Sequence, residues 1–171
     1  MKVGSQRILR PAKITFMLST TLVALAFNML PWPDVRWVPD LMALVLVFWC
    51  IHQPRKMGMG LAFVLGLLMD VVNGTLIGQH ALAYTLLAFG GYAVHRRILW
   101  FTQWQQSLHV LVLLLLAQTV MLAVRMIAGG TFPGLLIYFG SFVSAALWPV
   151  VTFLLLAPQR MPDSVDENRP L

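Results

Sequence analysis

Charged residues are scarce in this sequence. Asp, Glu, Lys and Arg make up 11% of its 171 residues, whereas hydrophobic residues make up 59% and the mean hydropathy is +0.79. A soluble domain of this length needs more polar and charged side chains to cover its surface. The composition therefore excludes an ordinary soluble globular protein and predicts an all-α membrane protein with several spans.

The motifs of common catalytic and metal sites are also missing. Cys50 is the only cysteine, so the chain cannot form an internal disulfide, and we interpret this thiol as a small buried side chain. The sequence contains no HExxH, no CxxC, no phosphate-binding Gly-Lys loop and no Ser-His-acid set at a known spacing. We therefore predict no catalytic residue, no cofactor and no metal ion, and a protein that is not an enzyme.

Six apolar runs are present instead. They cover residues 14–30, 41–51, 57–72, 76–94, 108–127 and 135–157. We predict that each crosses a bilayer as a helix, although the run 41–51 is short and needs either a thinned bilayer or shelter from its neighbours. The basic start and Ala24-Leu25-Ala26 also resemble a signal peptide, but the apolar run continues to residue 30 and favours a retained helix.

Basic residues alternate with the apolar runs. Ten of the twelve Lys and Arg lie in residues 1–13, 53–56, 95–97 and 158–171, which are the termini and every second connection. Cytoplasmic segments carry such an excess, so six spans with both termini in the cytoplasm are predicted, and the net charge of +6 does not indicate nucleic acid. The predicted organisation is a basic segment 1–13, a six-helix transmembrane domain 14–157 and a disordered tail 158–171.

Small residues recur every fourth position in the third run and share one broad helix face that ends in a carboxylate. These positions are Gly58, Ala62, Gly66 and Asp70. Small residues at this spacing let a second helix approach closely within a membrane, so the face is predicted to be a seam for helix packing or for a partner. Gly140 and Ser144 form a second, shorter face of this kind in the sixth run.

A carboxylate in an apolar run requires a partner, water or an interfacial position. Asp70 and Arg125 are both expected near the outer ends of their helices, so one hypothesis is an ion pair that ties the third helix to the fifth. Two alternatives stay open at this point. Each side chain reaches interfacial water separately, or Asp40 takes Arg125 in place of Asp70.

Three segments resemble the rod shape-determining protein MreD family of bacteria. They read PDLMALVLVFW at 39–49, GLAFVLGLLMD at 60–70 and GTLIGQHALAY at 74–84. The pattern Gly-x5-Gly-x3-Asp followed by Gly-x3-Gly is the most specific part. The length, the basic start and the six-run hydropathy are similar to that family too.

The resemblance implies a function that composition alone does not indicate. Members of this family are non-enzymatic inner-membrane proteins of the elongation machinery, which maintain rod shape by organising lateral peptidoglycan synthesis. The implied partners are an MreC-like single-span periplasmic protein, an MreB-like actin system and wall-synthesis enzymes, together with membrane lipids. The alternative is a small-molecule transporter subunit that resembles the substrate-binding component of vitamin transporters. A lipid-handling enzyme is a third class, against which the missing motifs argue.

Overall fold

The computed structural model describes residues 12–30 and 38–159, which form helices and no strands. Six α-helices follow one another, and a short 3-10 turn lies on each side of the last. They are α1 (Ile14–Asn28), α2 (Leu41–His52), α3 (Met59–Val72), α4 (Gln79–Ile98), α5 (Gln103–Ile127), η1 (Leu135–Tyr138), α6 (Phe139–Leu156) and η2 (Ala157–Gln159). The described part of the chain is therefore all-helical, as the composition predicts.

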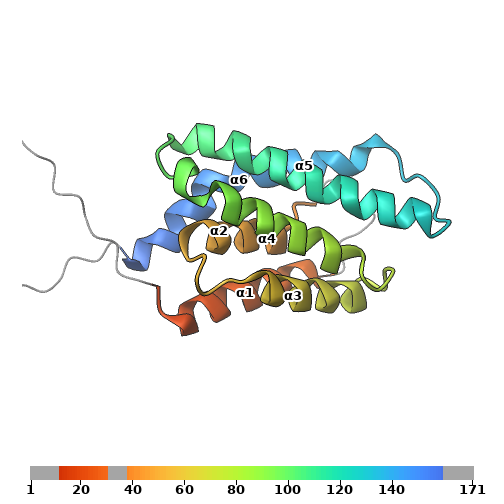
Figure 1. Cartoon of the computed structure of the whole chain (residues 1–171), viewed down its shortest axis with the longest axis horizontal. Coiled ribbons are helices and arrows are strands. Elements are labelled where there is room, and N and C mark those ends of the chain that lie inside the picture. Colours follow the sequence, from red (N-terminus) through yellow and green to blue (C-terminus); the bar gives the residue numbers. More distant parts are fainter. Residues whose placement is uncertain (1–11, 31–37, 160–171) are drawn as a thin grey trace, which may run out of the picture.

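Successive helices run in opposite directions along one bundle (Figure 1). One end of the bundle holds the start of α1 and the connections α2–α3 and α4–α5. The described basic residues at this end, which we call the basic end, are Lys13, Arg55, Lys56, Arg96 and Arg97. Arg125 lies in the last turn of α5, at the opposite end. Among the described residues, five of the six Lys and Arg side chains thus lie at one end of the bundle, and only Arg125 lies at the other.

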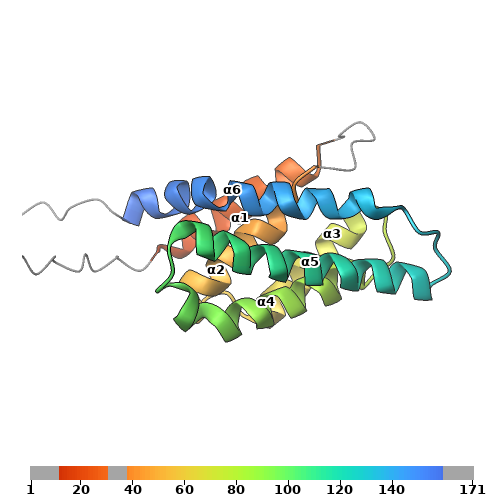
Figure 2. The same ribbon diagram turned by 90° about the horizontal axis from the view of Figure 1, so that it is seen from above.

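The short helix α2 lies among the other helices, as Figure 2 shows from above. It packs on α1, α4, α5 and α6, and ten of its twelve residues are buried. A helix that is hydrophobic on every side needs neighbours around its whole circumference. The packing therefore favours shelter by the neighbouring helices, rather than a thinned bilayer, as the way this short run is accommodated.

Two buried tryptophans join α2 to its neighbours. The indole N–H of Trp49, on α2, donates to the hydroxyl of Thr20 on α1 at 3.1 Å. Trp148, on α6, packs against Phe48 of α2 with ring centroids 6.0 Å apart and donates to the Gln106 side chain of α5 at 3.3 Å. Each tryptophan thus buries a large apolar surface while its N–H keeps a hydrogen-bond partner.

Helices α3 and α4 approach each other closely at Gly66. A Cβ atom added to Gly66 would lie 2.4 Å from the Cα of Ala81, so no larger residue fits unless α4 moves. Ala62, one turn earlier, is also fully buried. Gly58 is different, because it is exposed before the first turn of α3 and has open space around it. The packed part of the predicted face therefore begins at Ala62, and the helix that packs against it is α4 of the same chain.

Two segments of the described chain are long and apolar enough to cross a membrane by themselves: Gln103–Ile127 and Leu135–Gln159. The helices Ile14–Asn28, Leu41–His52 and Met59–Val72 are apolar but shorter. At 1.5 Å per residue these helices are about 18–23 Å long, less than a hydrocarbon core of about 30 Å. Length and composition thus identify two of the six predicted spans.

The close contact at Gly66 leads to a testable prediction. Gly66→Ala places a methyl group against the α4 backbone and should lower the free energy of unfolding by about 1–3 kcal/mol. Thermal unfolding of the detergent-purified protein measures this change. Gly60→Ala is the matched control in the same helix, because nothing lies within 4 Å of an added Cβ there. Equal melting temperatures for the two variants would contradict the close approach.

Candidate functional site

Polar side chains gather at the end of the bundle opposite the basic end. They come from the C-terminal ends of α1 and α3, from the residue that precedes α2, from the α3–α4 connection and from the first two turns of α4. The members of this polar cluster are Asn28, Asp40, Asp70, Thr75, His80 and Tyr84. Two carboxylates, Asp70 and Asp40, organise it, and each holds a different set of helices together.

Asp70 is fully buried and its carboxylate caps the start of α4. The backbone N–H of Gly78 donates to Oδ2 at 2.7 Å, and that of His80 donates to Oδ1 at 2.8 Å. Ala81 N–H lies 3.4 Å from Oδ2. The first N–H groups of a helix have no partner within the helix, and its N-terminus favours a negative charge. A carboxylate from the last turn of α3 therefore satisfies the first turn of α4.

Side chains of the α3–α4 segment complete this site. Nδ1 of His80 lies 2.8 Å from Oδ1 of Asp70, and the hydroxyl of Thr75 donates to the same oxygen at 3.1 Å. Gly78 has a φ of +101°, a left-handed conformation that a side chain would strain. The left-handed turn at Gly78 thus stands directly beside the carboxylate that its N–H binds. Thr75 and Gly78 of the GTLIGQH segment thus both donate hydrogen bonds to the Asp70 carboxylate.

The structure pairs Asp70 with His80 rather than with Arg125. Within the described residues no ion pair joins Asp70 to Arg125, and Arg125 is exposed. The reason is the order of helices in space: α3 packs on α4, whereas α5 packs on α4 and α6. Asp40, the second proposed partner of Arg125, is likewise held by other groups. The sequence hypothesis placed these charges at similar depth but could not show that α4 separates their helices.

Asp40 caps its own helix and binds two others. Its Oδ1 accepts the backbone N–H of Ala43 at 2.9 Å, the usual arrangement for an aspartate that precedes a helix. The amide of Asn28, at the end of α1, donates to Oδ1 at 2.8 Å, and the hydroxyl of Tyr84, on α4, donates to Oδ2 at 2.9 Å. One carboxylate therefore connects α1, α2 and α4 where α2 begins.

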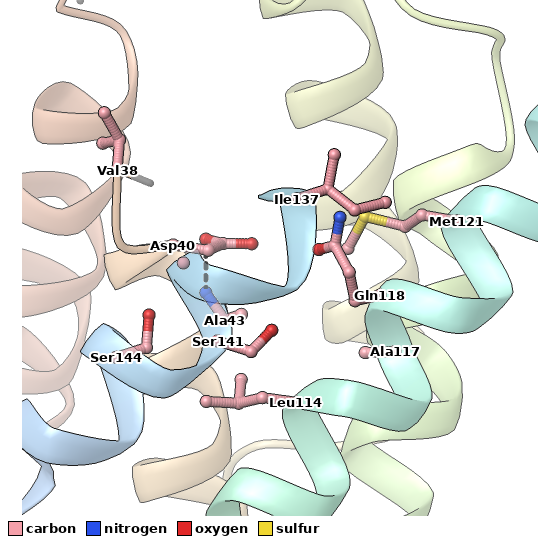
Figure 3. Close-up of a pocket in the computed structure, with 11 residues that line it drawn as sticks. Val38, Asp40, Ala43, Leu114, Ala117, Gln118, Met121, Ile137, Ser141 and Ser144 are labelled. Atoms are coloured by element: carbon pink, nitrogen blue, oxygen red, sulfur yellow. Dashed lines mark hydrogen bonds between the residues drawn. The ribbon is translucent and has the colours of Figure 1, made fainter. Parts of the chain in front are cut away.

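Two cavities meet beside Asp40. The larger has a volume of about 590 Å³ and is lined by polar groups that include Asn28, Asp40, Thr75 and His80. The smaller, of about 140 Å³, lies between the start of α2, α5 and α6 (Figure 3). Asp40 and Gln118 line both cavities. A carboxylate at the junction of two cavities is available to a ligand as well as to the protein.

Gly140 and Ser144, the second predicted small-residue face, lie inside the bundle. Both are buried and line the smaller cavity together with Ser141. Figure 3 shows the side chains of Ser141, Ser144 and Gln118 around the Asp40 carboxylate. This face therefore borders an internal cavity. The sequence had predicted that it packs against another helix or a partner.

Asn28 and Tyr84 are members of the polar cluster that motifs and spacing do not predict. Two signals could have found them. Asp40 stands directly before an apolar run, which marks a helix N-cap, and Asn28 is a polar residue near the end of the preceding run. Tyr84 lies four residues after His80 and therefore on the same helix face. The distance between α1 and α4 is a tertiary property that neither signal contains.

The chemistry of the polar cluster is that of binding and capping. Among the residues that the structure describes, no three His, Cys, Asp or Glu side chains come together as a metal site. The cluster offers carboxylate, amide and hydroxyl oxygens, and the described hydrogen bonds of Asp40 and Asp70 cap helices α2 and α4 and join neighbouring helices and connections.

The capping role of Asp70 leads to a second prediction. Asp70→Ala leaves buried N–H groups of α4 without an acceptor and should lower the free energy of unfolding by about 3 kcal/mol or more. Protein level in membranes and thermal unfolding measure the loss. Arg125→Ala is the control and should leave both unchanged, since Arg125 is exposed. Rescue of Asp70→Arg by Arg125→Asp would contradict this assignment.

The Tyr84 hydroxyl leads to a third prediction. Tyr84→Phe removes a donor to Asp40 in a fully buried site and should lower the free energy of unfolding by about 1–3 kcal/mol. Tyr92→Phe, an exposed tyrosine of the same helix, is the matched control. Melting temperatures of the two variants are compared in one detergent. A loss in Tyr92→Phe as large as in Tyr84→Phe would show that the Asp40 contact is not its cause.

Comparison with known proteins assigns the chain to a family. The family described as rod shape-determining protein MreD matches residues 10–157. The curated rod shape-determining protein MreD of Haemophilus influenzae is 31% identical over 145 residues, which cover 82% of this chain and 87% of that protein. No solved structure matches. Since the family match contains all six helices and both carboxylates of the polar cluster, the chain belongs to the MreD family of rod shape-determining proteins.

Proposed function

We propose that this protein is a non-enzymatic scaffold of the bacterial elongation machinery, which maintains rod shape by organising lateral peptidoglycan synthesis. The observation that carries the proposal is the family match over residues 10–157. Membership of a rod shape-determining family supports a role in determining cell shape. The scaffold role adds that the protein acts by holding other proteins in place.

The proposed location is the inner membrane, with all six helices as spans and both termini in the cytoplasm. Two segments are long enough to cross a bilayer alone, and the shorter α2 is covered by four other helices. The concentration of described basic residues at one end supports a cytoplasmic basic end. The polar cluster then faces the periplasmic side.

The proposed partners are an MreC-like single-span periplasmic protein, an MreB-like actin system and wall-synthesis enzymes. The Gly66 face is occupied by α4, and the Gly140–Ser144 face borders an internal cavity. A partner helix therefore needs a different surface. The outward faces of α1 and α3 are apolar and exposed at Leu22, Val23, Phe63 and Val64, so we propose them as the first surface to test.

The comparisons give no support to the alternative of a vitamin-type transporter subunit, because the matched family and the matched relative are both described by rod shape. The described charges also support a scaffold, since Asp40 and Asp70 both connect helices. We therefore favour rod-shape maintenance over transport as the function of this protein.

Depletion of the protein in its own host tests the proposed function. If it maintains rod shape, depleted cells should widen and become round, and a plasmid copy should restore the width. Cell width measured by microscopy during depletion is the readout. The Gly60→Ala copy, altered at an open site of α3, should restore rods as fully as the unaltered copy. Depleted cells that keep their rod shape and width would contradict the proposal.

A further inference from the structure

The short length of α2 creates an internal space. Its twelve residues extend about 18 Å, whereas the 25 residues of α5 extend about 37 Å, at 1.5 Å per residue. The bundle therefore continues beyond the N-terminus of α2, and the two cavities lie there, beside Asp40. Leu30, Val72 and Asn73 are exposed residues of the larger cavity, which is thus open to the surroundings.

Two polar atoms in this space have no hydrogen-bond partner among the residues that the structure describes. Ser144 is 1% exposed, lines the smaller cavity, and its hydroxyl makes no hydrogen bond. The side-chain oxygen of Asn28, which lines the larger cavity, is buried and makes none either. A buried polar atom without a partner destabilises a fold, so native proteins satisfy such atoms with a ligand or with water. Both atoms can therefore accept a hydrogen bond from a ligand or a water molecule in the cavities.

The charge of the space selects the kind of ligand. The described lining of the two cavities contains the Asp40 carboxylate and no Lys or Arg, so it disfavours an anion and favours a cation. The open hydrogen-bonding positions are oxygens: the carboxylate, the Asn28 amide oxygen and the Ser144 hydroxyl. A primary ammonium group has three N–H donors and one positive charge, which match this set.

The remaining walls indicate what carries the ammonium group. Leu114, Met121 and Ile137 also line the smaller cavity. A cavity of about 140 Å³ is larger than one water molecule needs and accommodates a few methylene groups beside the charged nitrogen. An alkylammonium fits these walls better than a bare metal ion, because a metal ion gains nothing from apolar contacts.

We propose that the junction of the two cavities is a binding site for a primary alkylammonium group, held by Asp40 with Ser144 and Asn28. The group comes either from the ethanolamine headgroup of a phospholipid or from a free amine. The site is independent of the proposed scaffold role, since it concerns a ligand inside the bundle. No catalytic or transport step is part of the proposal.

Lipid retention tests the proposal with a matched pair of ligands. Phosphatidylethanolamine and phosphatidylcholine of identical acyl chains differ only in the methyl groups that remove the N–H donors of the amine. Native mass spectrometry of the full chain, with each lipid added in turn, counts the lipid molecules retained. Added ethylammonium is the free-amine probe, and its binding is measured by its mass shift and by the melting temperature.

The expected result is a preference of about tenfold for the primary ammonium over its trimethylated counterpart. Ser144→Leu, which fills the smaller cavity, and Asp40→Asn, which removes the charge, should both abolish it. Ser19→Ala changes an exposed serine that bonds only within α1 and should retain it. Preference for the ethanolamine lipid without binding of ethylammonium identifies the headgroup as the source, whereas binding of ethylammonium identifies a free amine.

Two outcomes overturn the proposal. One is equal retention of the two lipids together with no effect of ethylammonium, which would mean that water fills the cavities. The other is a preference that survives in a folded Ser144→Leu protein, which would place the binding elsewhere. Melting temperatures of both variants show whether they fold. Because Ser144→Leu leaves every described contact of Asp40 intact, it tests the site even if Asp40→Asn does not fold.

Discussion

The burial of α2 among four other helices is the constraint on which the rest of this structure depends. Its apolar side chains cover its whole circumference, so α1, α4, α5 and α6 must all contact it. The helix is also the shortest of the six. The bundle that encloses it therefore continues past its N-terminus, and the polar cluster and both cavities lie in that extension. The burial and the short length of α2 thus account for both the core and the position of the candidate site.

The carboxylates of Asp40 and Asp70 solve the same physical problem in different ways. Each accepts N–H groups from the first turn of a helix, where no intrahelical acceptor exists. Asp40 caps its own helix, α2, whereas Asp70 reaches from α3 to the start of α4. Acids in apolar segments often indicate ion pathways or catalysis. In this protein their described contacts cap helices and join neighbouring ones.

Several features of this protein follow from short-range information. The scarcity of charge and the six apolar runs predict an all-helical fold, and basic residues at alternate connections predict one basic end. The spacing of Gly58, Ala62, Gly66 and Asp70 predicts a packed helix face, because positions four apart lie on one side of a helix, and the structure packs this face from Ala62 onward. The pattern from residue 60 to residue 84 indicates the family. Each inference needs only composition, periodicity or local order in the chain.

Other features depend on which helices become neighbours and how far each is displaced along the bundle axis. Asp70 binds His80 and the start of α4, and not Arg125, because α4 lies between α3 and α5. Gly66 contacts Ala81 of the same chain, so this face is closed to a partner, while Gly58 stays exposed. Ser144 lines a cavity that lies at the N-terminus of α2, beside Asp40. These are consequences of packing all six helices together, and no single segment contains that information.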